Sequence, residues 1–219
     1  MHLVSAPVVE EWAVLSDEQV VARVLAGQTA LFEVLMRRHN ERLYRAARAI
    51  VKDESESEDV MQQAYVNAYS HLHQFDRRAK FSTWLTRIAV HEAIARARRR
   101  GRYMTMEEDA PRAAASGGAD PERQAFAGEL NRLVESAIDR LPDGAREVFV
   151  LRQVEELSTE EAAYVLDVSE AVVKTRLSRA RAALRRDLEQ HAGLAEANAF
   201  RFLRPRCNAV VAGVLSRIL

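Results

Sequence analysis

A run of basic residues in the C-terminal half of the chain has the composition needed to bind phosphate. Residues 174–186 read KTRLSRARAALRR, with six basic residues and no acidic one, although the chain as a whole is formally neutral. At 100° per residue, one helical stripe of this run is apolar and consists of Val173, Leu177, Ala180 and Leu184. Pointing away from this stripe are Thr175, Ser178, Arg179 and Arg186, and flanking it are Lys174, Arg176 and Arg181. One face can therefore pack against the protein while the other meets phosphates and base edges.

The residues before this run have the pattern of a helix-turn-helix. Ser158 and Glu161 have the spacing of a capping box, which predicts a first helix over residues 159–166. A two-residue turn follows, and Ser169 is the expected cap of the second, basic helix. In such a pair the second helix enters the major groove of DNA. Taken alone, the segment also fits a solvated basic helix, which is common in all-helical proteins.

A second basic segment, residues 75–100, combines cations with aromatic rings. Its helical part is predicted from Phe81 to Arg100, with Ser82 as a cap, and it ends in several arginines. Exposed rings can stack on unpaired bases for about 1–3 kcal/mol each, while basic side chains follow the backbone. We expect Trp84 to lie mostly in the core, so the better candidates for contact are in the preceding loop: Phe75, Asp76, Arg77, Arg78 and Lys80.

Composition limits the classes of protein that the chain can be. Its 219 residues include only 8 glycines and 5 prolines, and its apolar residues recur at helical spacing, which predicts an all-α protein. A single cysteine, Cys207, excludes an intramolecular disulfide, and we expect neither a signal peptide nor a membrane span, hence a cytoplasmic protein. His71 and His73 are too few for a metal site, and no glycine-rich phosphate loop is present. We therefore expect no metal, no cofactor, no catalytic residue and no small-molecule substrate.

One break in the helical pattern divides the chain into parts. Residues 102–124 are rich in small and charged residues and contain two prolines and a glycine pair, which predicts a flexible linker. We expect one domain over residues 22–101, a second over 125–190, and a helical extension over 191–219. The extension has an apolar stripe that must pack on something, formed by Val210, Val211, Val214, Leu215, Ile218 and Leu219.

Three stretches in this order resemble a known family. They read EDVMQQAYVNAYSHLHQFD, FSTWLTRIAV and, after the linker, LPDGAREVFVLRQVEELSTEEAAYVL. Together with the basic helix they resemble a bacterial RNA polymerase sigma factor of the extracytoplasmic-function group, over about residues 22–188. The resemblance implies a region 2 that binds core RNA polymerase and the minus-ten element, and a region 4 that binds the minus-thirty-five element as duplex DNA.

The resemblance also assigns residues to these tasks. It implies polymerase binding by the acidic helix that starts near Asp53, through Asp59, Gln62, Gln63 and Asn67. It implies reading of the minus-ten element by Phe75, Asp76, Arg77, Lys80, Phe81, Trp84, Arg87 and His91. It implies reading of the minus-thirty-five element by Lys174, Thr175, Arg176, Ser178 and Arg179. His91 departs from the family, which often has Asn there, and Ala171 and Val172 stand where Gly and Thr are frequent.

Partners and alternatives follow from the same resemblance. It implies core RNA polymerase, promoter DNA and an anti-sigma factor as partners. For the polar face of the acidic helix the alternative is an ordinary amphipathic surface, and for His91 it is a structural, hydrogen-bonded histidine. For the whole chain the alternative is a helix-turn-helix regulator that binds duplex DNA without polymerase. A helical-bundle enzyme is less favoured, because no Glu-x-x-His pair occurs.

Overall fold

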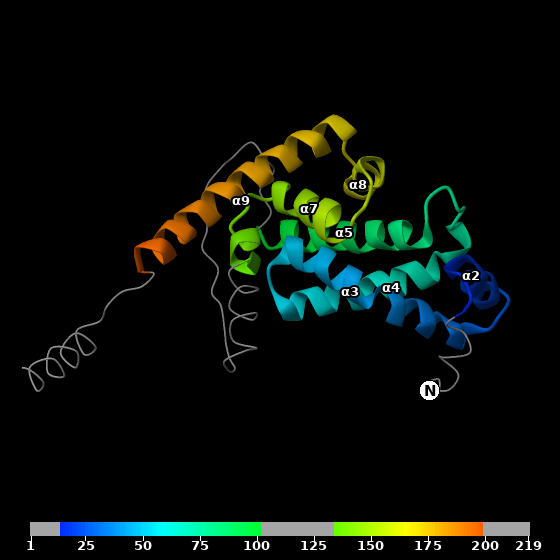
Figure 1. Ribbon diagram of the computed structural model, residues 1–219. Coiled ribbons are helices and arrows are strands. Elements are labelled where there is room, and N and C mark those ends of the chain that lie inside the picture. The colour runs from blue at the N-terminus through cyan, green and yellow to red at the C-terminus, as the bar shows by residue number, and fades with distance from the viewer. Residues whose placement is uncertain (1–13, 102–133, 199–219) are drawn as a thin grey trace, which may run out of the picture.

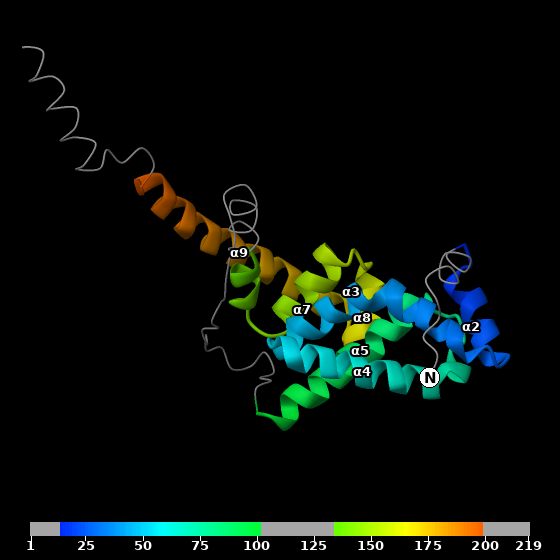
Figure 2. The same cartoon turned by 90° about the horizontal axis from the view of Figure 1, so that it is seen from below.

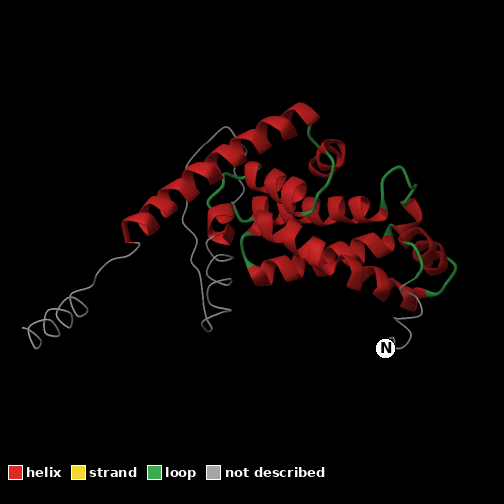
Figure 3. Cartoon of the chain, in the orientation of Figure 1, coloured by secondary structure: helices red, strands yellow, loops and turns green. Residues whose placement is uncertain are grey.

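The computed structural model describes residues 14–101 and 134–198, and in these ranges every regular element is a helix (Figures 1 and 3). The N-terminal unit, residues 14–101, contains α2 (Asp17–Leu25), α3 (Phe32–Val51), α4 (Glu54–Ser70) and α5 (Phe81–Arg99), with short 3-10 turns η1 (Thr29–Leu31) and η2 (Leu72–Gln74). The C-terminal unit, residues 134–198, contains α7 (Ala145–Phe149), the π-helical turn η3 (Val150–Val154), α8 (Thr159–Leu166) and α9 (Glu170–Asn198). The expected all-α fold is confirmed.

Local hydrogen bonds explain where most helices begin and end. Ser16 and Ser158 each form a complete capping box, with Gln19 and Glu161 respectively. The carboxylate of Asp53 accepts a hydrogen bond from the N–H of Glu56 at 2.8 Å and so starts α4. These side chains satisfy backbone N–H groups that have no partner inside the helix.

The N-terminal unit is a bundle of α3, α4 and α5, with α2 packed at one end (Figure 1). Asp17 at the start of α2 accepts from Arg38 at 2.9 Å and contacts His39 at 2.8 Å, which fixes α2 to α3. Its own apolar core includes Leu35, Leu43 and Leu85, each fully buried.

The C-terminal unit lies across this bundle rather than apart from it. α8 packs on α5 and α7 packs on α3, while the long α9 runs over the top and extends beyond the bundle (Figures 1 and 2). One buried cluster joins residues of both units, whereas a smaller cluster of Leu141, Ala145 and Ala180 belongs to the C-terminal unit alone.

One predicted helix cap is absent from the structure, and two predicted domain boundaries fall inside helices. Ser82 does not cap α5: the helix already begins at Phe81, with Lys80 at the cap position and no side-chain cap bond. Ser82 therefore lies in the first turn, where its carbonyl accepts from the Thr86 hydroxyl at 2.7 Å. The boundary expected at residue 22 falls inside α2, and the one expected at 190 falls inside α9.

The remaining predictions concern segments that the structure does not describe. The linker, residues 102–124, the apolar stripe of the extension and Cys207 lie outside the described residues. Within the described ranges, no helix is long and apolar enough to cross a bilayer.

Candidate nucleic-acid interface

The helix-turn-helix forms as the sequence predicts. The Ser158 hydroxyl accepts from the N–H of Glu161 at 3.0 Å, and the Glu161 carboxylate accepts from the N–H of Ser158 at 2.8 Å. α8 then runs over the predicted residues and ends at Asp167, which adopts the left-handed conformation with φ 56°. The hydrogen bond from the Ser158 N–H, supported by the charge of Lys80, lowers the pKa of Glu161.

The first half of α9 presents a basic face. Val173 and Ala180 are fully buried and Leu177 and Leu184 are half-buried, so the predicted apolar stripe does pack against the unit. The opposite face is exposed and carries Lys174, Thr175, Ser178 and Arg179. Lys174 is 69% exposed and its ammonium lies 3.5 Å from the Glu170 carboxylate, a contact that an approaching phosphate can replace.

Two of the expected recognition residues are partly engaged with the protein itself. The hydroxyl of Thr175 donates to the carbonyl of Ala171 at 2.9 Å. The guanidinium of Arg176 lies over Gly144, where an added Cβ would be 3.1 Å from Cζ. Nε of Arg176 is buried and has no hydrogen-bond partner among the described residues. Arg176 therefore packs α9 against the start of α7, and Lys174, Ser178 and Arg179 are the better placed of the set.

The candidate minus-ten segment is built on an aromatic cluster. Phe75, Phe81 and Trp84 have ring centroids 5.4–5.7 Å apart. Phe81 is only 1% exposed, so its ring supports the loop from the core and is not available for stacking in this structure. Phe75 and Trp84 are half-buried at the edge of the same core.

The loop in front of α5 exposes its polar residues. Asp76 accepts from the backbone N–H of Arg78 at 3.1 Å and pairs with its side chain at 3.0 Å. Arg77 is exposed and has a positive φ of 62°, and Lys80 is 77% exposed with its ammonium 3.4 Å from Glu161. The loop thus offers cations at a turn that the aromatic cluster holds in place.

The second turn of α5 faces the C-terminal unit across a cavity of about 380 Å³. The cavity is lined by Asn67, Trp84, Arg87, Ile88, His91, Glu92 and Tyr164. The guanidinium of Arg87 lies 4.3 Å from the centroid of the Tyr164 ring, and one of its nitrogens lies 3.6 Å from Asp167. Burial lowers the pKa of His91, and Arg87 acts in the same direction.

The polar face of α4 is exposed but internally paired. Asp59 accepts from Arg96 of α5 at 2.6 Å, and the amide of Gln63 donates to Asn67 at 2.9 Å. Gln62 is exposed on the same helix. Asn67 lines the cavity described above together with residues of α5 and with Tyr164 of α8.

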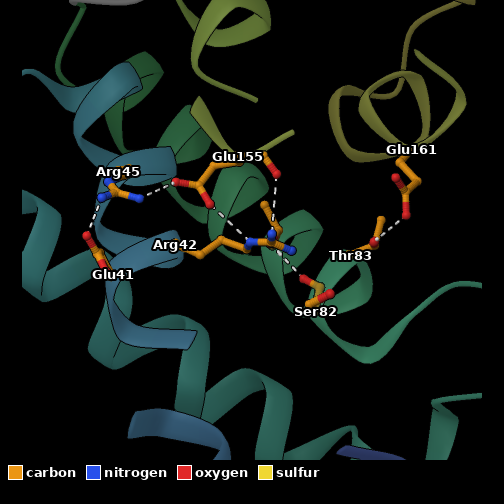
Figure 4. Close-up of polar contacts among 8 residues, drawn as sticks. Glu41, Arg42, Arg45, Ser82, Thr83, Glu155 and Glu161 are labelled. Carbon is orange, nitrogen blue, oxygen red and sulfur yellow. Dashed lines mark hydrogen bonds and ion pairs between the residues drawn. The ribbon is translucent and has the colours of Figure 1, made fainter. Parts of the chain in front are cut away.

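Sequence reasoning missed the polar contacts between the two units. Arg42 and Arg45 of α3 both bind the carboxylate of Glu155, and Thr83 of α5 donates to Glu161 (Figure 4). The basic residues of α3 recur at helical spacing, which is a visible signal. Their acidic partners lie on other elements, and no local pattern indicates that they meet.

No group of three or more potential metal ligands occurs in the described ranges. The fold and the exposed residues fit a helical DNA-binding protein with two separate candidate contact sites, a helix-turn-helix and a loop with basic and aromatic residues.

Comparisons with known proteins show the family to which the chain belongs. The family model of sigma-70 region 2 matches residues 35–103, and that of sigma-70 region 4 matches residues 131–184. The chain is 32% identical to the ECF RNA polymerase sigma factor SigW of Bacillus subtilis, covering 77% of this chain and 94% of that protein. It is 33% identical to the RNA polymerase sigma-H factor of Pseudomonas aeruginosa and to the ECF RNA polymerase sigma-E factor of Escherichia coli K12, covering 94% and 93% of those proteins.

Solved structures agree with these relatives. CnrH, in complex with the cytosolic domain of CnrY, is 32% identical, with a TM-score of 0.59 over 80% of this chain and 97% of that one. The sigma factor RpoE of Bartonella quintana, solved with the anti-sigma factor NepR, has the same fold, with 24% identity and a TM-score of 0.53 over 72% of this chain and 96% of that one. The chain belongs to the extracytoplasmic-function group of the sigma-70 family. It is an RNA polymerase sigma factor, and the alternative of a regulator that acts without polymerase is not favoured.

Proposed function

We propose that this sigma factor binds promoter DNA and core RNA polymerase through the residues that the resemblance assigns. Among these, the exposed residues make the contacts and the buried ones support them. In this scheme α4 faces core RNA polymerase, with Gln62 and Gln63 the most accessible of its four assigned residues. The loop and helix from Phe75 to His91 read the minus-ten element, and the exposed face of α9 reads the minus-thirty-five element.

The observation that carries the proposal is the division of α9 into two faces. Its apolar stripe is packed, whereas Lys174, Ser178 and Arg179 are exposed. Arginine can bind guanine O6 and N7 together, while lysine adds affinity through phosphate. In the minus-ten segment the supporting rings and the exposed cations are likewise separated, so Phe81 holds the loop and Arg77 and Lys80 contact DNA.

Three further statements belong to this proposal. The protein acts by binding alone, since capture of an extruded base can offset the few kcal/mol that unpairing costs. It works in the cytoplasm, where a sigma factor meets RNA polymerase. An anti-sigma factor is its regulator, which is supported by the Bartonella quintana RpoE structure, solved with the anti-sigma factor NepR.

The test is transcription by purified core polymerase on a promoter library, with and without this protein. We expect initiation only when the protein is present, at promoters that share two elements. Polymerase-independent binding to duplex DNA without initiation would contradict the proposal.

Substitutions then test which residues read the upstream promoter element. The double variant Lys174→Ala/Arg179→Ala is expected to reduce initiation about tenfold or more at promoters that depend on the upstream element. Arg37→Ala, the same kind of change at an exposed position of α3, serves as the control. An unchanged upstream preference in the double variant would exclude these residues as the readers.

A further inference from the structure

An apolar groove lies between α9 and the end of α7. Its volume is about 510 Å³, and its lining residues are Phe149, Arg181, Leu184, Arg185, Leu188 and Glu189. Leu188 lies one helical turn after the half-buried Leu184, yet 47% of its surface is exposed. The interior of the groove is therefore apolar, and the charged residues that border it are exposed.

The groove is the open side of a small core. Phe149 and Leu184 line the groove, and both also pack, partly buried, against the cluster of Leu141, Ala145 and Ala180. Two of the three buried residues in that cluster are alanines, which bury little apolar surface each. An apolar helix laid in the groove would add a layer of larger side chains to this core.

The segment that follows α9 has the pattern of such a helix. Residues 206–219 read RCNAVVAGVLSRIL, and their apolar stripe consists of Val210, Val211, Val214, Leu215, Ile218 and Leu219. At 100° per residue, Ser216 points away from this stripe and Arg217 lies at its edge. A helix of this length is not stable alone in water, so its apolar face needs a surface on which to pack.

A proline separates this segment from α9. Pro205 lacks a backbone N–H and disfavours helical backbone at Arg204, so α9 is not expected to continue through it. A turn over residues 199–205 would have the usual length of a connection between two antiparallel helices. The sequence therefore favours a helical hairpin in which the segment returns along α9.

The lengths of the two arms of this hairpin agree. A helix over residues 206–219 is about 21 Å long, and so is the stretch of α9 from Asn198 back to Leu184. An antiparallel return therefore brings the apolar stripe beside Leu184 and Leu188. Because the connection is short, the effective concentration of the segment at the groove is about millimolar, which favours it over a separate molecule.

The charges along the groove fit the same direction. In the antiparallel arrangement Arg217 lies across from the stretch of α9 that carries the exposed Glu189. Nearer the other end of the groove, Arg181 donates to the side chain of Gln153 at 2.9 Å. There the segment presents Ile218 and Leu219, which the aliphatic stems of Arg181 and its neighbour can cover.

We propose that residues 206–219 form a helix that folds back along α9 and fills the groove at Phe149, Leu184 and Leu188. The segment then completes the core of the C-terminal unit and is a structural part of it. This inference does not depend on which residues bind DNA or polymerase.

The reaction rates of single thiols test the docking in the full chain. In a Cys207→Ser background, Val214→Cys places a thiol on the apolar stripe and Ser216→Cys places one on the opposite face. We expect the first thiol to react with a water-soluble disulfide reagent at least about tenfold more slowly than the second, because the groove covers it. In concentrated urea the two rates are expected to become equal.

A change in the groove then locates the covering surface. Leu188→Lys places a charge in the groove and is expected to raise the rate of the Val214→Cys thiol to that of the Ser216→Cys thiol. Ala182→Lys makes the same kind of change at an exposed position of α9 that does not line the groove, and it should leave both rates unchanged. If Leu188→Lys loses its helical circular dichroism, the milder Leu188→Asn takes its place.

Three results would overturn the proposal. Equal rates for the two thiols in the native chain would show that the segment is not docked. Protection that persists in the groove variant would place the segment on another surface. Protection that disappears on dilution would mean that the segment of a second copy, and not that of the same chain, occupies the groove.

Discussion

At the scale of single residues, Arg146 shows how a buried charge can join two units. Its side chain has no solvent exposure, and it donates to the carbonyl of Leu141 at 2.9 Å and to Asp143 at 2.7 Å. It also donates to the carbonyl of Ala49, at the end of α3 in the other unit. A buried guanidinium is tolerated only when its donors are satisfied in this way.

Replacing Arg146 by Met keeps most of the buried volume and removes these hydrogen bonds. We expect the free energy of unfolding to fall by about 3 kcal/mol, because two buried carbonyls and one carboxylate lose a donor. Urea denaturation followed by circular dichroism measures it. Arg140→Met is the control: Arg140 is exposed and pairs with Asp187 at 2.7 Å, and its loss should cost below about 1 kcal/mol. Equal losses would show that the buried bonds of Arg146 contribute nothing special.

We expect His91 to make the free energy of unfolding depend on pH. Burial against α8 and repulsion from Arg87 lower its pKa below 6.5, although Asp167 and a hydrogen bond with the backbone of Val165 oppose the shift. Because its pKa is lower in the folded chain than in the unfolded chain, the unfolded chain binds more protons between the two values. The contribution of neutral His91 is therefore present above pH 6.5 and is lost as the pH falls through the lowered pKa.

The substitution His91→Asn tests this dependence, since Asn hydrogen-bonds but does not titrate. We expect the urea midpoint of the original protein to fall between about pH 7 and pH 5 more steeply than that of the variant. Parallel curves for the two proteins would mean that His91 is not the group responsible.

At the scale of elements, α8 has two tasks that depend on one capping box. Ser158 and Glu161 start the helix, and the same Glu161 carboxylate contacts Thr83 and Lys80 of α5. A helix of eight residues is too short to be stable by itself and needs both its cap and its packing. The start of the helix-turn-helix is thus coupled to the contact between the units.

Ser158→Ala is expected to lower the free energy of unfolding by about 1 kcal/mol, the usual cost of an N-cap. Chemical denaturation measures the change. Ser178→Ala, at an exposed position within α9, is the matched control and should stay within about 0.5 kcal/mol of the original protein. If both substitutions had the same effect, the capping box would not be what holds α8 in place.

At the scale of the whole molecule, the chain has no net charge, but at the contact between the units its basic and acidic residues lie on different units. Bases of the N-terminal unit face acids of the C-terminal unit, so the contact between the units pairs opposite charges. Such pairs are partly exposed and therefore sensitive to salt.

Raising the salt concentration from about 0.1 M to about 1 M shortens the Debye length from about 10 Å to about 3 Å. We expect this to weaken the ion pairs between the two units and to shift the emission of Trp84, which lines the cavity against Tyr164, to longer wavelength. The chain has two tryptophans, so the measurement uses a Trp12→Phe background. Glu155→Gln, which removes the negative charge that pairs with both Arg42 and Arg45, should reach the midpoint of the emission shift at lower salt. An emission spectrum that salt leaves unchanged in both proteins would contradict the expectation.

Much of the fold was predictable because its signals are local. The capping box at Ser158, the turn at Asp167 and the apolar stripe of α9 each lie within a few residues, and all three form as expected. The helix α2 was missed although Ser16 and Gln19 show the same capping spacing. Ser82 was assigned as a cap because its type suits that role, but Phe81 is packed in the core as the first residue of α5, so the cap position lies two residues earlier, at Lys80.

The sequence by itself therefore determined the all-α class, the helix-turn-helix and the family. Only the tertiary structure decided that Arg176 packs over Gly144, that Phe81 is buried, and that α8 packs on α5. The physical reason is range: Arg42 and Glu155 are 113 residues apart and Arg48 and Asp139 are 91 apart, so no periodicity or capping rule relates them. Their pairing depends on how the two units pack against one another.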